Sequence, residues 1–184
     1  DGFEKKALKI LKQKPKLRLI DASSINFNNI ENIISNFENI LLQTPDNKKF
    51  QSNNFKVVSK IKPSSKTLKD LIFAFNICRF AKSNAIILTK ERSTVGIGSG
   101  QPSRLDSCKI AIDKMKKFNE NNDHKLLAAS DAFFPFVDGV ECLIQAGVNA
   151  IIQPSGSIRD KEIIQFANKT KTILVFSKTR HFRH

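Results

Sequence analysis

Hydrophobic residues in the C-terminal part of the chain form short continuous runs, separated by amphipathic stretches. These patterns predict strands at 126–130, 149–153 and 172–176, with helices between them at 137–147 and 159–169. Strands that alternate with helices of about ten residues are typical of a layered α/β domain with a partly parallel sheet. We therefore expect an α/β fold.

The preceding part of the chain is less regular. A short amphipathic helix is predicted from Phe3 to Lys12, and strands are predicted at 16–21 and 55–61. The hydrophobic period of the segment 29–47 is ambiguous between helix and strand. The other predicted elements are a helix capped by Ser64 or Ser65, a strand pair at 84–90 and 94–98, a helix that Ser103 starts, and a polar loop at 119–125.

Charge changes this picture only slightly. The 184 residues carry a net charge of +14, which favours anionic partners, but the lysines are spread along the chain and no nucleic-acid-binding motif is present. A basic protein can equally handle small anionic substrates. We therefore expect no nucleic acid as partner, and a basic nucleic-acid or polyanion-binding module stays the alternative.

The three cysteines, Cys78, Cys108 and Cys142, are far apart and lie in apolar helical patterns. This favours buried thiols in a reducing compartment over disulfides or a zinc site. Neither a signal peptide nor an apolar run near the roughly 18 residues of a membrane span occurs. The expectation is a soluble, cytoplasmic protein with no membrane partner.

Ligands of such sheets bind at loops beyond the carboxyl ends of the strands. Gly96, Gly98 and Gly100 precede a helix, so their N–H groups could face an anion, although glycines in a hairpin corner explain them equally well. Arg104 lies one residue into that helix, where its charge opposes the helix dipole. Its position predicts a partner outside the helix.

The loop SDAFFPFVDG is the second candidate. Phe133, Phe134 and Phe136 either plug the space between strand and helix or form a platform for a flat heterocycle. Asp131 and Asp138 lie on its flanks, where carboxylates can accept ring or amino hydrogens.

Two further segments end strands. In QPSGSIRD, Ser155 or Ser157 is predicted as an N-cap, with small residues that also let a ligand approach the helix. The terminal TRHFRH contains His181 and His184 without the acidic or cysteine companions of a zinc site. Together the loops predict a surface for a planar anion, and the reaction does not follow from them.

The segments KSNAIILTK, TVGIGSGQPSRLDSCKIA, SDAFFPFVDGV, IIQPSGSIRD and RHFRH together resemble a known family. They are similar to the C-terminal half of the bifunctional purine biosynthesis proteins, which join an AICAR transformylase to an IMP cyclohydrolase. The resemblance spans nearly the whole chain. It implies a three-layer α/β fold with cytidine-deaminase-like transformylase lobes without zinc, residues 1–62 ending the first lobe and 63–184 forming the second.

The resemblance also implies a reaction, the transfer of a formyl group from the cosubstrate 10-formyltetrahydrofolate to the 5-amino group of AICAR. The residues expected to contact AICAR are Asn84, which also supports catalysis, Arg104, Phe133 and Arg180. Those expected on the folate side are Leu105, Asp138, Ser157 and Ile158. No metal is expected, and the family's site lies at a homodimer interface.

Two departures from the family pattern stand out. ENILLQ at 38–43 replaces GGLLVQ, and Pro102 stands where Met or Gln is expected, beside Arg104. The family's catalytic Lys-His pair and its cyclohydrolase domain belong upstream of Asp1. The chain is therefore expected to be a fragment that binds substrate weakly and does not turn over alone.

Overall fold

The computed structural model describes residues 2–25, 32–35, 37–48, 50, 52–118 and 125–184. Contacts divide the chain into two compact units, Asp1–Asn47 and Lys48–His184, which are considered one at a time. The assignment of 1–62 and 63–184 to two transformylase lobes stays a prediction. Of the predicted polar loop at 119–125, all but the last residue lies outside the described residues.

The first unit contains one helix and one hairpin among its described residues. Helix α1 (Lys5–Leu11) confirms the predicted helix. Strands β1 (Asn32–Ser35) and β2 (Ile40–Gln43) pair antiparallel within the segment 29–47, whose hydrophobic period is ambiguous between helix and strand. The strand predicted at 16–21 is wrong, because the backbone there joins no ladder. A strand needs a hydrogen-bonded neighbour, and an apolar run alone does not supply one.

The hairpin exposes apolar side chains from both of its strands. The exposed large hydrophobic residues in and beside it are Ile33, Ile34, Phe37, Ile40, Leu41 and Leu42. Successive residues of a strand point to opposite faces, so neither face is polar. An isolated two-stranded hairpin is at best marginally stable in water. The composition of this hairpin is therefore typical of one whose apolar side chains are covered by another protein surface.

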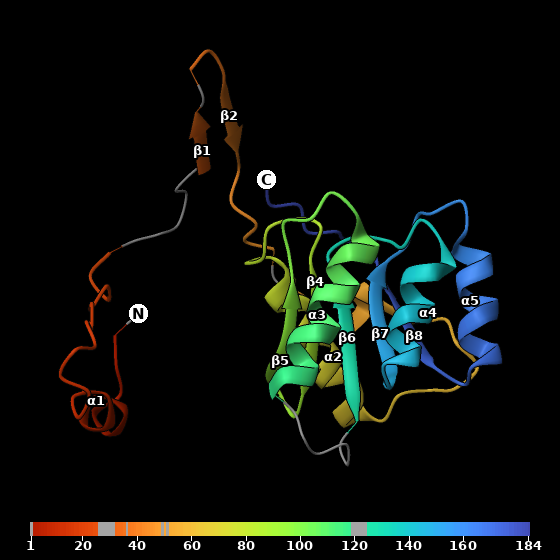
Figure 1. Ribbon diagram of the computed structural model, residues 1–184, viewed down its shortest axis with the longest axis horizontal. Coiled ribbons are helices and arrows are strands. Elements are labelled where there is room, and N and C mark those ends of the chain that lie inside the picture. The colour runs from red at the N-terminus through yellow and green to blue at the C-terminus, as the bar shows by residue number, and fades with distance from the viewer. Residues whose placement is uncertain (1, 26–31, 36, 49, 51, 119–124) are drawn as a thin grey trace. The chain divides into compact units, whose positions relative to one another are not determined.

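The second unit is built on a six-stranded mixed sheet of order β3-β8-β7-β6-β4-β5 (Figure 1). Its strands are β3 (Phe55–Val57), β4 (Ile86–Lys90), β5 (Ser93–Gly98), β6 (Leu126–Ser130), β7 (Val148–Pro154) and β8 (Ile173–Ser177). The three central strands β6, β7 and β8 are parallel, and β3, β4 and β5 run antiparallel to their neighbours. The predicted partly parallel sheet is confirmed.

Helices cover both faces of this sheet. They are α2 (Ser65–Cys78), α3 (Arg104–Phe118), α4 (Val137–Gln145) and α5 (Asp160–Lys169), with a short 3-10 turn η1 (Ser52–Asn54) before β3. In Figure 1, α3, α4 and α5 lie in front of the sheet and α2 lies behind it. The predicted three-layer arrangement is confirmed, whereas the likeness to cytidine deaminases stays a prediction.

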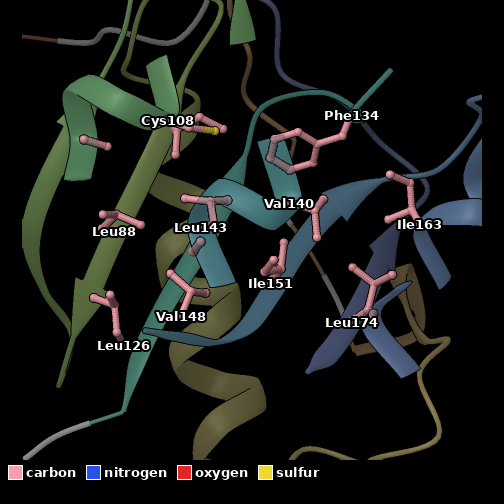
Figure 2. Close-up of a cluster of buried hydrophobic side chains, with 14 of the residues drawn as sticks. Leu88, Cys108, Leu126, Phe134, Val140, Leu143, Val148, Ile151, Ile163 and Leu174 are labelled. Atoms are coloured by element: carbon pink, nitrogen blue, oxygen red, sulfur yellow. The ribbon is translucent and has the colours of Figure 1, made fainter. Parts of the chain in front are cut away.

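The core is divided between the two faces by the alternation of side chains along each strand. Leu88 and Ile151 pack under α3, α4 and α5 in the cluster of Figure 2. Their neighbours Ile87 and Ile152 pack against α2 on the other face. Strands buried on both faces read as continuous apolar runs, which is why the sequence marked them so clearly.

Two helix starts test the capping predictions. Ser64 caps α2, because its Oγ accepts the N–H of Thr67 at 3.1 Å, as predicted. The predicted serine cap of α5 is wrong: Arg159 is the N-cap residue, and the Asp160 carboxylate accepts the N–H groups of Gly156 and Ser157. A carboxylate in the first helical turn also suits the helix dipole.

The glycines of β5 allow close packing of the strand against α3. A Cβ on Gly96 would collide with the carbonyl oxygen of Ala111, and one on Gly98 with that of Ser107. Neither of the two interpretations of these glycines, an anion site or a hairpin corner, included this close approach of the β5 backbone to α3. The contact holds the first turn of α3 over the edge of the sheet.

We predict that Gly98→Ala lowers the free energy of unfolding by about 1–3 kcal/mol, because the neighbour is a helix backbone that cannot yield cheaply. Urea unfolding of the chain measures this change. Ser93→Ala, at the exposed start of the same strand, is the matched control and is expected to leave the stability unchanged. Equal midpoints for Gly98→Ala and the unaltered chain would contradict the packing account.

Candidate functional site

A cavity of about 380 Å³ lies at the edge of the sheet where β4 begins and β6 ends. Three segments line it: the segment just before β4, the end of the β5–α3 loop with the start of α3, and the β6–α4 loop with the first turn of α4. The lining residues are Asn84, Pro102, Ser103, Arg104, Leu105, Phe134, Pro135, Phe136, Asp138 and Gly139. The loops after β6, β7 and β8 leave the same edge of the parallel strands, as the sequence predicted.

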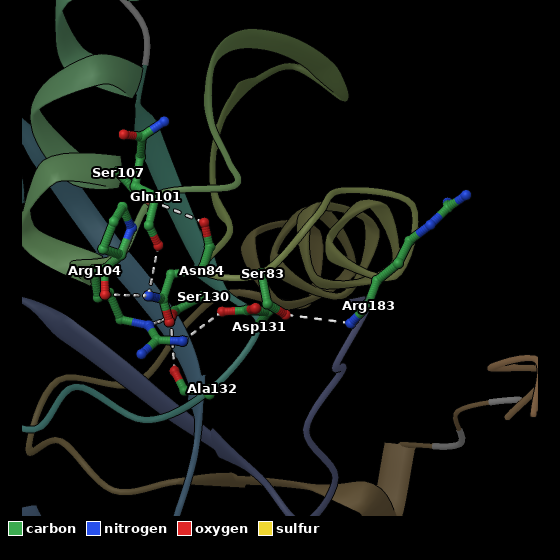
Figure 3. Close-up of polar contacts among 10 residues, drawn as sticks. Ser83, Asn84, Gln101, Arg104, Ser107, Ser130, Asp131, Ala132 and Arg183 are labelled. Carbon is green, nitrogen blue, oxygen red and sulfur yellow. Dashed lines mark hydrogen bonds and ion pairs between the residues drawn. The ribbon is translucent and has the colours of Figure 1, made fainter. Parts of the chain in front are cut away.

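Arg104 forms the most buried charged contact of this cavity. Its guanidinium NH2 donates to Oδ1 of Asp131 at 2.7 Å, and its Nε–H donates to Ser130 Oγ at 3.0 Å (Figure 3). The Asp131 side chain is fully buried and that of Arg104 is only 10% exposed. The partner predicted for Arg104 outside its helix is therefore Asp131, at the end of β6.

Asn84 ties the segment before β4 to the segment before α3. Its side-chain amide donates to the carbonyl oxygens of Gln101 (2.9 Å) and Pro102 (3.2 Å). Its own main-chain oxygen accepts the hydroxyl of Ser107 at 2.9 Å. These bonds fix the chain that carries Arg104 into the cavity, including Pro102, which departs from the expected residue.

The aromatic loop after β6 divides between core and cavity. Phe134 is 1% exposed and belongs to the hydrophobic core, and its ring also lines the cavity. For this ring, the prediction of a hydrophobic plug between strand and helix is correct. Phe133 is half-buried and does not line the cavity. Gly139 makes room for Phe134, since a Cβ there would come 2.7 Å from two ring carbons.

The opposite rim of the cavity reaches the loop after β7. Phe136 lines the cavity and is half exposed, and the guanidinium of Arg159 lies 4.9 Å from its ring centroid. Arg159 follows Ile158 directly, so this contact brings the loop of Ser157 and Ile158 beside the cavity. Asp138, at the start of α4, lines the cavity between these parts.

The C-terminal tail folds back onto the second unit. His181 is 1% exposed, its ring lies 4.5 Å from Phe75 and 5.2 Å from Phe50, and its N–H donates to the Asp131 carbonyl at 2.8 Å. The Ser83 N–H donates to the Arg183 carbonyl oxygen at 3.0 Å, and the Arg183 N–H donates to the Ser83 hydroxyl oxygen at 3.2 Å (Figure 3). The last residues of the chain therefore pack against the protein.

Comparison with known proteins identifies the family of the chain. The family model described as AICARFT/IMPCHase bienzyme matches residues 1–114. This chain belongs to that family. Two proteins of Buchnera aphidicola, from Schizaphis graminum and from Baizongia pistaciae, and one of Lactobacillus acidophilus are similar to it, and each is described as "Bifunctional purine biosynthesis protein PurH".

The similarity to these bienzyme family members covers nearly the whole chain. Identity is 42%, 42% and 41% respectively, over 99%, 99% and 100% of this chain, but over only 35%, 35% and 36% of those proteins. The chain thus spans about a third of the length of the relatives it matches. The resemblance drawn from the loops is confirmed at the level of the family.

The geometry gathers half of the residues that the family resemblance singled out. Asn84 and Arg104 from the AICAR set, and Leu105 and Asp138 from the folate set, line the same cavity. The remaining four do not: they are Phe133, Arg180, Ser157 and Ile158. Phe134, which the sequence offered either as a plug or as part of a ligand platform, serves in both the core and the cavity wall, and Gly139 makes room for its ring.

The remaining candidate groups are not arranged for thiol or metal chemistry. Burial raises the pKa of the Cys78 and Cys108 thiols, and burial also raises that of half-buried Cys142. Because the thiolate is the nucleophile, none of these cysteines is activated at neutral pH. Across the described residues, no group of three or more His, Cys, Asp or Glu side chains is placed to hold a metal ion.

No helix in the same residues is long and apolar enough to cross a membrane.

We predict that His181→Ala lowers the free energy of unfolding by about 2–4 kcal/mol, because it empties a buried space between two phenylalanine rings. His184→Ala is the matched control, since that residue is exposed at the end of the same tail. Thermal or urea unfolding of the two variants compares them. Equal losses of stability, or none, would contradict the tail packing.

A thiol-labelling experiment checks the cysteine assignments. With a thiol-reactive disulfide at pH 8, we expect Cys142 to react first, and Cys78 and Cys108 to react only after the chain is unfolded in urea. The reason is their complete burial together with a raised pKa. Peptide mapping of the labelled protein identifies the sites. Fast labelling of Cys108 in the folded chain would show that this helix face is open.

Proposed function

We propose that this chain carries part of the site at which 10-formyltetrahydrofolate formylates AICAR. The observation that carries the proposal is the shared cavity: residues expected to contact AICAR and residues expected to contact the folate line one hollow of about 380 Å³. Formyl transfer needs both substrates in one place and orientation. Membership of the bienzyme family supports the same reaction.

In the proposed reaction, the 5-amino nitrogen of AICAR attacks the formyl carbon. The new C–N bond forms as the bond from the formyl carbon to folate N10 breaks. The amine gives up a proton to a base, and N10 takes up a proton and leaves as tetrahydrofolate. An aromatic amine is a weak nucleophile, so orientation and proton removal supply much of the rate. The Lys-His pair that serves as this base is proposed to lie in the part of the protein outside this chain.

Arg104 and Asn84 are the groups proposed to hold AICAR. Arg104 has five N–H donors in a planar fork, and two of them are bound to Ser130 and Asp131. The others are available to the anionic or carboxamide oxygens of AICAR at the cavity wall. Phe133 and Arg180 are proposed to complete this side, with the half-buried ring against the flat imidazole and the exposed guanidinium toward the anion.

Asp138 and Leu105 are proposed to hold the folate. The Asp138 side chain is exposed at the cavity, where its carboxylate can accept the ring hydrogens of a pterin. Ser157 and Ile158 are proposed to lie along the remainder of the cosubstrate. The contact of Arg159 with Phe136 supports this, because it fixes their loop beside the cavity rim.

The setting of the site is proposed by the same reasoning. The protein is proposed to be a cytoplasmic homodimer, and the apolar hairpin β1–β2 supports a covering subunit. Alone, the chain is proposed to bind substrates weakly and not to turn over. The IMP cyclohydrolase activity of the family is proposed to reside outside this chain.

The test is steady-state formyl transfer by the full-length protein and its Asp138→Ala variant. We expect the KM for the folate to rise at least about tenfold, with the KM for AICAR nearly unchanged, because one charge-assisted hydrogen bond is lost. Asp113→Ala, at an exposed position on α3, is the matched control and is expected to behave like the unaltered enzyme.

Two results would contradict the proposal. One is a full-length protein that does not formylate AICAR. The other is binding of RNA that falls steeply with salt and ignores both AICAR and folate analogues, which would instead support a basic polyanion-binding module.

A further inference from the structure

Asp131 joins three segments that are distant in the sequence. Its N–H donates to the carbonyl of Ala85 at 3.1 Å, and its own carbonyl accepts the N–H of His181 at 2.8 Å. Its Oδ1 accepts the guanidinium of Arg104 at 2.7 Å. Every polar group of this residue except Oδ2 is therefore bound, and each binds a different part of the chain.

Each of these contacts lies at or beside a residue proposed to hold AICAR. Ala85 follows Asn84, Arg104 is itself in the set, and His181 follows Arg180. Phe133, the fourth member, lies two residues beyond Asp131 on the same loop. Asp131 thus binds Arg104 directly and binds the chain neighbours of Asn84 and Arg180, although it does not line the cavity itself.

The charge of Asp131 is what the arrangement requires. Its side chain is completely buried, and its Oδ2 has no hydrogen-bond partner among the described residues. Burying a carboxylate costs free energy unless a cation lies against it. The ion pair therefore holds the NH2 end of the Arg104 guanidinium against Asp131. The neighbouring bond from Arg104 Nε–H to Ser130 fixes the plane of the guanidinium. The remaining donors are then held in a fixed direction.

We propose that Asp131 is the positioning residue of the AICAR half of the site. It acts through Arg104 and through the tail, and it does not touch the substrate. The inference rests on the proposed function. It predicts that a change at Asp131 affects the recognition of AICAR and leaves the recognition of the folate alone.

The experiment uses the full-length enzyme with Asp131→Asn, which keeps the shape of the side chain and both main-chain bonds but removes the charge. We expect the KM for AICAR to rise about tenfold or more, because a small displacement of an orienting group is enough for such a loss. The KM for the folate is expected to stay within about twofold. Asp106→Asn is the matched control, because Asp106 lies in the first turn of α3 with an exposed side chain that pairs with Lys109.

A second measurement separates positioning from general loss of structure. If Asp131 acts through Arg104, the effects of Asp131→Asn and Arg104→Lys on the KM for AICAR are not additive in the double variant. Additive effects, or equal rises in both KM values, would overturn the inference. Asp131→Glu keeps the charge but moves the guanidinium, and is expected to show the same split between the substrates.

The outcomes also separate this inference from the proposed function. If the unaltered enzyme does not formylate AICAR, the proposed function fails. If it does so and Asp131→Asn leaves the KM for AICAR unchanged, only the role of Asp131 fails. If neither Asp131 variant folds while the Asp106 control does, Asp131 is a structural residue and the inference is wrong.

Discussion

The buried ion pair between Arg104 and Asp131 is the contact on which the candidate site depends. A carboxylate without access to water is stable only when a cation and hydrogen-bond donors surround it. This requirement brings the start of α3 to the end of β6, where Ser130 and Asp131 receive the guanidinium. The cavity forms between these elements, so its position depends on the ion pair that holds them together.

Packing on both faces of the sheet supports that contact. On one face, Gly96 and Gly98 let β5 lie directly against α3, which fixes where Arg104 enters. On the other face, the ring of His181 packs with Phe50 and Phe75 beside α2. The tail therefore reaches Asp131 from the side of α2, whereas Arg104 reaches it from the side of α3. The site lies where the two halves of the core meet.

Sequence patterns predicted the regular part of this fold because its strands are buried on both faces and its helices are amphipathic. They failed where structure depends on a partner that the local sequence does not show. The run 16–21 is apolar enough for a strand, but within the described ranges no strand pairs with it. The start of α5 is held by hydrogen bonds from two main-chain N–H groups to the Asp160 carboxylate. The general preference for serine at helix N-caps does not predict these bonds. Arg104 was marked by its unfavourable place in the helix dipole, whereas the importance of Asp131 appeared only from its burial and its three partners.

The most direct test of the account is a crystal structure of the full-length enzyme with AICAR bound. The account predicts that AICAR lies in the cavity beside Asn84 and Arg104, with the Arg104–Asp131 pair intact and the free donors of the guanidinium on the ligand. AICAR bound at another place, for example in a hollow that Ser64, Asp70 and Glu91 help to line, would contradict it.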